Sequence, residues 1–366
     1  MAKRSLQVGK VNKFSKREVL FLFIIIILII ALLAAVFYKG DLTSVFNPQP
    51  NDELENDKIY HSFYSDNTNI SLPQQFNQEA ILEVHFIDVG QGDAILIRLP
   101  DQKDIFIDAG SGTSASTERK NQFSDYLFDM SIEELEYLII THAHSDHVNM
   151  ADILVNNYDI NTIMFHDLYE NTSMVFRNFV DLSNSKQDAD VVTIGEEWEF
   201  FTFENQEYSY KMNIYAPGTS FSNDSNSQSI LCLLEYHETK VLFTGDATIE
   251  TEEYFINLFE EPLDIDILKI GHHGSATSTS EEFLDFLTPE YAVICVAENN
   301  AYNHPSPFTM NRLFNHGLVT YRTNRHGNIT LYIDDQNNFG FLCQKPVPPE
   351  NNRLKIQEKL IILDNN

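Results

Sequence analysis

The stretch that decides the fold is YLIITHAHSDH, residues 137–147. Residues 137–141 are mostly apolar or β-branched and predict a short buried strand. Three imidazoles and one carboxylate follow at once, from His142, His144, Asp146 and His147. Because side chains alternate with period two at a strand end, His142 and His144 can point to the same side. Asp146 and His147 lie one turn further on and can face a second ion. Imidazole and carboxylate are ligands of zinc, manganese and iron, so the motif predicts a metal site.

Two further segments carry the same chemistry at the ends of apolar strands. Residues 243–246 read FTGD and residues 271–275 read GHHGS. In both segments, glycine permits the sharp turn that must follow the strand. A solvated histidine-rich loop is the alternative for residues 142–147, and these two companion segments argue against it. We predict that Asp246 bridges two ions and that either His272 or His273 is a ligand. We favour His272, with the other orienting the substrate or a neighbouring group.

The rest of the chain up to about residue 335 alternates strand and helix patterns in two similar halves. Strands are predicted at 81–89, 94–99, 104–107, 162–165, 211–215, 229–236, 240–243, 265–270, 292–296 and 328–333. Helices are predicted within 117–130 and at 151–157, 250–259 and 309–315. Ser278 to Glu281 fits a capping box that opens a further helix through Leu287. This order favours the α/β (α+β) class, with two sheets in the middle and helices outside.

The N-terminal part of the chain carries a membrane-anchor signal. Residues 20–38 read LFLFIIIILIIALLAAVFY, 19 residues without a charge, which is enough for a helix to cross roughly 30 Å of hydrocarbon. Six basic residues and one acid precede it in residues 1–19. This asymmetry predicts a cytoplasmic basic segment at 1–19, a single transmembrane signal anchor at 20–38 and the bulk of the chain outside the cell membrane. A cleaved signal peptide is the alternative, although the apolar run is long and no clean small-x-small site follows it.

Three more segments complete the predicted organisation. Residues 39–80 are rich in Asn, Gln, Asp and Pro and read as a polar stalk, with an edge element packed on the domain as the alternative for its second half. Residues 81–345 form the predicted main domain, which carries the metal motifs. Residues 346–366 form a tail that is polar and then weakly helical.

Composition limits the classes of partner. The chain has 366 residues, with 24 Lys+Arg against 54 Asp+Glu and a formal net charge of −30. Broad electrostatic capture of nucleic acid needs a basic surface, so it is disfavoured, although a local phosphate site is not excluded. The three cysteines, Cys232, Cys295 and Cys343, are too few and scattered for a disulfide framework or a thiolate zinc cluster.

Taken together, the motifs resemble the metallo-β-lactamase superfamily, and most of all the extracellular hydrolase domain of ComEC-type DNA-internalisation competence proteins. The resemblance covers residues 81–335 and is carried by HFIDVGQGDAILIRLP (85–100), FIDAGSG (106–112), LIITHAHSDH (138–147), VLFTGDA (241–247), LKIGHHGSATSTSEEFL (268–284) and NHPSPFTMNRL (303–313). It implies a four-layer αβ/βα sandwich with a dinuclear site at one edge, occupied by two divalent metal ions, Zn or Mn.

The resemblance also implies a ligand set. By its motifs, His142 and His144 hold the first metal, Asp146 and His147 hold the second, Asp246 bridges them and His272 completes the second site. Asp146 is also expected to act in catalysis.

The resemblance extends to residues around the ligands. Asp108 is expected to brace the histidine loop by hydrogen bonding rather than to ligate. Asp88 and Asp93 flank the GQG turn, where they either stabilise the turn or take part in catalysis. His304 is a candidate substrate ligand or proton donor, with a structural histidine as the alternative.

The sequence departs from the family pattern in three places. The histidine that usually precedes the bridging Asp is absent from residues 226–229, NSQS, which places the strength of the first metal site in doubt. The usual Gly-Gly after the histidine motif is Asn149-Met150, and the frequent His-Pro-His-Pro is HPSP at 304–307. One predicted span also cannot by itself form a whole DNA-uptake channel.

These observations lead to a functional prediction with alternatives. The predicted activity is metal-dependent hydrolysis of a phosphodiester, in DNA or in a cell-wall polymer, by a membrane-anchored enzyme of the competence branch. One alternative is an esterase acting on the phosphorylcholine of teichoic acid, and another is a catalytically weak module of competence assembly. A β-lactamase or lactonase is a third.

Overall fold

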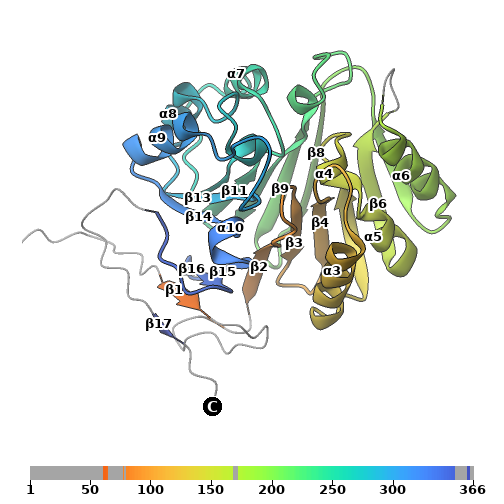
Figure 1. Ribbon diagram of the computed structural model, residues 1–366, viewed down its shortest axis with the longest axis horizontal. Coiled ribbons are helices and arrows are strands. Elements are labelled where there is room, and N and C mark those ends of the chain that lie inside the picture. Colours follow the sequence, from red (N-terminus) through yellow and green to blue (C-terminus); the bar gives the residue numbers. More distant parts are fainter. Residues whose placement is uncertain (1–60, 65–76, 78–79, 168–171, 351–360, 363–366) are drawn as a thin grey trace, which may run out of the picture. The chain divides into compact units, whose positions relative to one another are not determined.

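The computed structural model describes residues 61–64, 77, 80–167, 172–350 and 361–362, all within the unit formed by residues 58–366 (Figure 1). The predicted basic segment, the anchor at 20–38 and most of the stalk lie outside the described residues. Within the described ranges, no helix has both the length and the apolar character that a membrane span requires.

The first sheet has ten strands among the described residues, in the order β17-β1-β16-β15-β2-β3-β4-β5-β6-β7. Its strands are β1 (His61–Tyr64), β2 (Ile81–Phe86), β3 (Ala94–Arg98), β4 (Asp104–Ala109), β5 (Glu134–Ile139), β6 (Asp159–His166), β7 (Asp190–Ile194), β15 (Ile329–Asp334), β16 (Phe339–Cys343) and β17 (Ile361–Ile362). Strands β4 to β7 run parallel, and β4 and β5 are in register at Ile107 and Ile139. The late strand β15 pairs antiparallel with β2. The last part of the domain therefore joins the same sheet as the first part.

The second sheet has seven strands among the described residues, in the order β14-β13-β12-β11-β10-β9-β8. They are β8 (Glu199–Asn205), β9 (Tyr210–Ala216), β10 (Leu231–Tyr236), β11 (Thr239–Phe243), β12 (Ile267–Lys269), β13 (Tyr291–Ile294) and β14 (Val319–Arg322). Strands β11 to β14 are parallel, and Phe243 is in register with Lys269. The carboxyl ends of β11 and β12 therefore lie at the same edge of this sheet.

Helices cover the outer face of each sheet (Figure 1). The helices are α3 (Thr117–Asp129), α4 (Ser145–Val148), α5 (Ala151–Asn157), α6 (Met174–Ser185), α7 (Ile249–Ile256), α8 (Glu281–Leu287), α9 (Pro307–Asn315) and α10 (Thr323–His326), with 3₁₀ turns η1 (Asn226–Gln228) and η2 (Gly271–Gly274). Buried side chains of α3, α5 and α6 join one apolar cluster with the first sheet. Those of α7, α8 and α9 join another cluster with the second sheet.

The central core lies between the two sheets and completes four layers. One cluster of buried side chains takes members from both sheets, including Val84 and Phe86 of β2 and Val241 and Phe243 of β11. The rings of Phe86 and Phe243 meet across the layer, with centroids 6.2 Å apart. Each fully buried phenylalanine contributes about 1.5–3 kcal/mol of hydrophobic free energy, so this layer holds the two sheets together. The predicted mixed fold with two sheets inside and helices outside is confirmed.

Most predicted elements are present, with two informative differences. Strand β1, at residues 61–64, lies within the segment predicted as a stalk, and pairs in parallel with β16 on one side and β17 on the other. The helix α8 is capped by Ser280, whose side chain accepts from the Phe283 N–H at 3.1 Å. The predicted cap, Ser278, instead donates to the carbonyl of Ala247, because its hydroxyl is drawn into the buried turn beside η2.

The loop before α8 rests on a buried carboxylate, Glu252 of α7. It accepts hydrogen bonds from the backbone N–H groups of Thr279 and Ser280. Burial raises the pKa of Glu252 to about 7, against these hydrogen bonds, which lower it. The native state therefore holds a proton that the unfolded chain has released, throughout the interval from about pH 4.5 to 7.

We therefore expect the stability of the chain to depend on Glu252 in a defined direction. As pH rises through that interval, the free energy of unfolding of the wild type should fall relative to that of Glu252→Gln, by about 3 kcal/mol. Urea unfolding of both proteins from pH 5 to 8 measures the difference. The control is Glu253→Gln, at an exposed position of the same helix. Parallel pH profiles for wild type and Glu252→Gln would contradict the prediction.

Candidate metal centre

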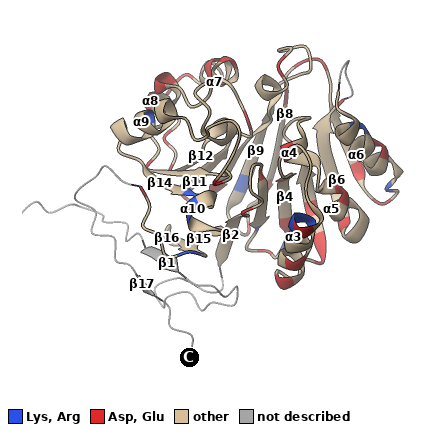
Figure 2. Ribbon diagram, in the orientation of Figure 1, with Lys and Arg blue, Asp and Glu red and all other residues tan. Residues whose placement is uncertain are grey.

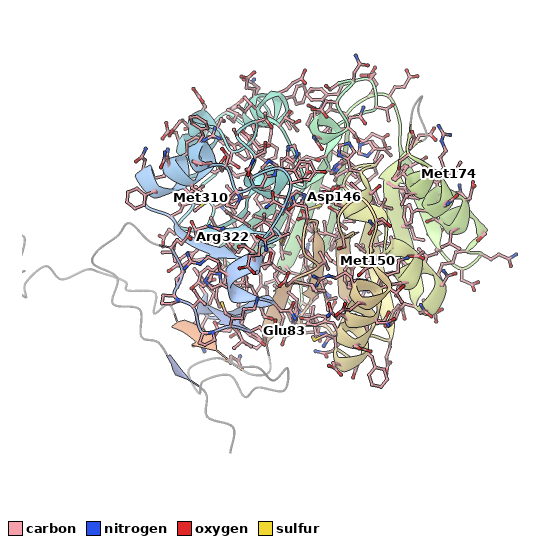
Figure 3. All side chains as sticks on the ribbon, viewed as in Figure 1. Glu83, Asp146, Met150, Met174, Met310 and Arg322 are labelled. Atoms are coloured by element: carbon pink, nitrogen blue, oxygen red, sulfur yellow. The ribbon has the colours of Figure 1, made fainter. Side chains whose placement is uncertain are left out.

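The predicted site residues come from loops at the ends of strands in both sheets. His142 and His144 follow β5, Asp146 and His147 lie on α4, Asp246 follows β11, and His272 and His273 lie in η2 after β12. Figure 3 shows Asp146 between the half of the domain that carries α3 to α6 and the half that carries α7 to α9. Segments far apart in the chain thus meet at one place.

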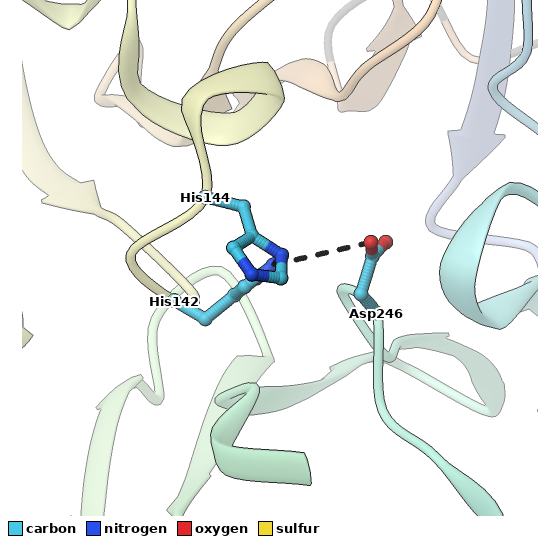
Figure 4. Close-up of side chains that lie close together, drawn as sticks. All are labelled: His142, His144 and Asp246. Atoms are coloured by element: carbon cyan, nitrogen blue, oxygen red, sulfur yellow. Dashed lines mark hydrogen bonds and ion pairs between the residues drawn. The ribbon is translucent and has the colours of Figure 1, made fainter. Parts of the chain in front are cut away.

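The first candidate ligand group consists of His142, His144 and Asp246 (Figure 4). One possible ligand atom from each residue lies within 4.8 Å of those from the other two. The Nε2 of His142 is 3.9 Å from Oδ2 of Asp246 and 3.1 Å from Nδ1 of His144. Two imidazoles and one carboxylate are the three protein ligands of an open catalytic zinc site.

A second group adjoins the first and shares the Asp246 carboxylate. Asp146, His147 and His273 form one triplet within 4.8 Å, and Asp93, His147 and Asp246 form another. The Nε2 of His147 is 3.2 Å from Oδ1 of Asp246, and the Nε2 of His273 is 3.6 Å from the same oxygen. A carboxylate with one oxygen toward each group has the position of a bridging ligand.

Unpaired buried atoms show that these residues fit cations. Oδ1 of Asp246, Nε2 of His147 and Nε2 of His273 are buried and make no hydrogen bond of good geometry with the described residues. Each buried polar atom left unpaired costs roughly 1–3 kcal/mol, and here the unpaired atoms face one another. A cation between them would satisfy all three at once, because Nδ1 of each imidazole already faces an oxygen acceptor and a neutral ring then offers the lone pair of Nε2.

The two adjacent histidines of η2 take different positions. His273 is buried, its Nδ1 is 2.9 Å from the carbonyl of Cys295, and its Nε2 is 3.4 Å from Oδ2 of Asp146. The side chain of His272 is 24% exposed, with its Nε2 3.8 Å from Oδ2 of Asp246. The ligand groups therefore contain His273. His272, which the sequence favoured as the ligand, lies at the rim of the same site.

The backbone of η2 explains why both imidazoles reach the site. His272 and His273 have φ of 48° and 52°, in the left-handed region that residues other than glycine seldom adopt. Such strain persists where the surrounding structure fixes it, and it is concentrated at functional sites. Here it turns two consecutive side chains toward the Asp246 carboxylate, at different depths.

Asp108 holds the histidine loop in place. Its carboxylate accepts from the N–H of Thr141 at 2.7 Å, from the hydroxyl of Thr141 at 2.8 Å and from Nδ1 of His147 at 2.7 Å. The last bond leaves Nε2 of His147 as the nitrogen that faces Asp246. A carboxylate that orients a ligating imidazole in this way raises its basicity.

Asp93 and Lys269 form a buried ion pair behind the site. Lys269 is fully buried, contacts Asp93 through Nζ and donates to the carbonyl of Gly245 at 2.9 Å. Oδ1 of Asp93 lies 3.5 Å from Nδ1 of His273. A lysine inside an apolar strand is a signal of a buried partner. Asp88 makes a turn contact, accepting from the N–H of Gly90 at 3.2 Å.

The electrostatics of the site favour a cation as well. Burial raises the pKa of Asp246. The nearby charges of His273 and His147 outweigh this effect and hold the pKa well below its usual range. Burial and the neighbouring His147 hold the pKa of His142 well below the ordinary value, so this imidazole is neutral. An ionised carboxylate and a neutral imidazole are ready to bind a metal. Burial lowers the pKa of His147 and His273, but the carboxylate of Asp246 raises both above the ordinary value, so a cation bound there would displace protons from these two imidazoles.

Two departures from the family pattern have structural roles here. Ser229 lies where a histidine is usual, with its hydroxyl 3.3 Å from Nδ1 of His142 and accepting from the N–H of Asp246 at 3.0 Å. The side chain of Asn149 donates to the carbonyls of Ser111 and Gly112, both at 2.9 Å. Each residue therefore ties the histidine motif to a neighbouring segment.

A pocket of about 520 Å³ opens over the ligand groups. It is lined by Gln91, Thr113, His144, Ser145, Asp146, Asn226, Asp246, His272, His273, Tyr302 and His304. His304 is half-buried, and its burial, together with the neighbouring His272, lowers its pKa to about 4. A neutral imidazole at this position is better suited to a hydrogen bond with the substrate than to proton donation.

Residues 87–298 match the Metallo-beta-lactamase superfamily, and the chain belongs to this superfamily of metal-dependent hydrolases. Several of its curated relatives are named as competence or recombination proteins. The chain is 29% identical over 266 residues to ComE operon protein 3 of Bacillus subtilis, which is 68% of this chain and 32% of that protein. It is 29% identical to Recombination protein 2 of Haemophilus influenzae, over 68% of this chain and 28% of that protein. It is 27% identical to Competence protein ComA of Neisseria gonorrhoeae, over 66% of this chain and 30% of that protein. The chain thus matches about a third of the length of each relative.

Proposed function

We propose that this chain is a dinuclear metal-dependent phosphodiesterase, acting as a nuclease of the ComEC-like competence branch and anchored to the cell membrane with its catalytic domain outside. The observation that carries the proposal is the Asp246 carboxylate, shared between two groups of buried imidazole and carboxylate ligands. The anchor and its direction are supported by the apolar run at 20–38 and its basic flank.

The residues divide into ligands and supports. His142, His144 and Asp246 would hold one cation, and Asp146, His147, His273 and Asp246 the other. Two divalent ions, Zn or Mn, would lower the pKa of a water molecule and neutralise the negative charge that develops during hydrolysis.

The chain's own groups prepare this chemistry. Asp108 fixes the ring of His147, and the carbonyl of Cys295 fixes that of His273. His304 faces the pocket as a neutral imidazole, able to hydrogen-bond an oxygen or hydroxyl of the substrate. The carboxylate of Asp146, 21% exposed, lies at the boundary between ligand group and pocket.

The charge distribution supports hydrolysis at one local phosphate. Figure 2 shows Asp and Glu spread over helices of both outer layers, with few Lys and Arg. Neither Lys nor Arg is among the described residues that line the pocket. Since side chains there supply no positive charge, bound cations would be the main partners of a phosphate. The same observation is compatible with the cell-wall alternative, in which each phosphorylcholine group offers one local phosphodiester.

A substrate panel tests the proposal. The full chain, purified in mild detergent and loaded with Mn or Zn, is offered single-stranded DNA, duplex DNA, a phosphorylcholine ester and a lactam. We expect about two equivalents of bound metal and cleavage of DNA that stops when the metal is chelated. If only the phosphorylcholine ester is cleaved, the nuclease proposal is wrong and the cell-wall esterase takes its place. Folded protein that binds no metal and cleaves none of the four would identify an assembly module instead.

A further inference from the structure

One wall of the metal pocket is an exposed aromatic ring. Tyr302 is 56% exposed and lines the same pocket as Asp246 and His273. Its ring stacks on that of His304, with centroids 5.7 Å apart and planes inclined by 28°. The His304 ring in turn lies 5.4 Å from that of His272. A flat surface backed by imidazoles therefore stands beside the ligand groups.

The loop that carries Tyr302 is held by the side chain of one residue, Asn300. The amide of Asn300 donates to the carbonyls of Ala297 at 3.1 Å and His304 at 2.7 Å. Its oxygen accepts from the N–H groups of Tyr302 at 3.1 Å and His304 at 2.9 Å. Four hydrogen bonds from one side chain fix the loop before any ligand arrives, so little ordering entropy is lost on binding.

The same loop is attached to the ligand segments. The N–H of Ser306 donates to the carbonyl of Gly274 at 2.8 Å, directly after His273. Gly274 has φ +82°, and a Cβ there would lie 2.6 Å from that of Pro305, so the two segments pack without space between them. On the other side, Oε1 of Gln91 accepts from the N–H of Ala297 at 3.3 Å. The separation of Tyr302 from the ligand groups is therefore built into the fold.

We propose that Tyr302 is the stacking platform for a planar base of the substrate, next to the phosphodiester that is hydrolysed. This inference rests on the proposed function and names a residue that sets its specificity. The other described walls of the pocket include the neutral side chains of Gln91, Thr113 and Asn226, and no Lys or Arg. Any affinity for the substrate that the cations do not supply must then come from contacts with neutral side chains. An unpaired base can leave its stack to lie on Tyr302, whereas a base inside a duplex cannot.

The test compares substrates that differ only in their bases. The full chain, loaded with its metal, cleaves oligothymidylate and an abasic oligonucleotide of equal length. We expect kcat/KM to be roughly 10- to 100-fold higher for oligothymidylate, the range that base–aromatic stacking gives. Tyr302→Ala should bring this ratio close to one, and Tyr302→Phe should retain it. Asn300→Ala, which frees the loop, should give an intermediate ratio. Phe308→Ala is the control, because Phe308 is 73% exposed and does not line the pocket.

The outcomes separate this inference from the proposed function. If the wild type cleaves neither oligonucleotide, the nuclease proposal fails. If it cleaves both equally well, or if Tyr302→Ala keeps the wild-type ratio at equal metal content, the stacking platform is overturned while the nuclease stands. Because the Tyr302 side chain is largely exposed, its truncation leaves the core intact, and circular dichroism of the variants verifies this.

Discussion

Replacing Asp246 by asparagine is expected to remove metal from the protein and to abolish its hydrolytic activity. Asp246 belongs to both the His142–His144 group and a group with His147, so its loss affects both sites. Losing a partner that only supports a ligand costs roughly 10- to 100-fold in metal affinity, and loss of the bridge should exceed that. Metal content measured by mass spectrometry should fall from about two equivalents to below one, with turnover reduced by more than about 100-fold.

The matched control is Asp285→Asn on helix α8, whose side chain is 77% exposed. It changes the same functional group and the same net charge far from the ligand groups, so metal content and turnover should equal those of the wild type. Retention of two equivalents by Asp246→Asn, with turnover within about tenfold of wild type, would contradict the bridging role.

The second large effect is expected for Gly110→Ala, a change outside the ligand groups. A Cβ at Gly110 would lie 2.1 Å from the carbonyl carbon of Asp146 and 2.2 Å from the backbone nitrogen of His147. Atoms of the backbone cannot turn aside as a flexible side chain can, so the histidine motif itself must move. A displacement near 1 Å in a catalytic constellation costs about 100-fold in rate, and we expect at least this loss in turnover. The stability of the chain should fall by about 3 kcal/mol, the upper end for overpacking.

Gly112→Ala provides the comparison within the same loop. Gly112 has φ +55°, and a Cβ there would meet nothing within 4 Å. Its replacement should therefore cost about 1 kcal/mol of backbone strain and leave turnover nearly unchanged. Thermal unfolding and phosphodiester turnover of both variants measure the contrast. If the two variants have the same stability and the same turnover, the close contact of Gly110 with the histidine motif does not matter for activity.

The sequence predicted the parts of the fold that local pattern determines. Strand β5 and the histidine motif after it are adjacent in the chain, so their relation needs no tertiary information. Strands β7, β8, β14 and β16 and helix α6 were missed. The residues of β8, EFFTFEN, alternate in burial, which was a usable signal, whereas Gly340 inside β16 weakens the strand pattern. The strand β1 is placed by its pairing with β16, which no local pattern reveals.

The choice between His272 and His273 shows what sequence cannot supply. Both are histidines, both follow the same strand, and only the left-handed backbone of η2 decides which side chain is buried. The pairing of Asp93 with Lys269 likewise joins distant segments of opposite sheets. The role of Asp108 was easier to predict, because its place in a family motif suggested that it supports the histidine loop. Its three hydrogen bonds, to Thr141 and His147, give that support.

The return of β15 to the side of β2 has a consequence for biosynthesis. Every proposed ligand, from His142 to His273, leaves the ribosome before β15 does. A nascent polypeptide thus carries all the chemistry of the centre while β2 still lacks its neighbour and the first layer is unfinished. Completion of the first sheet therefore requires residues that are synthesised after every one of those ligands.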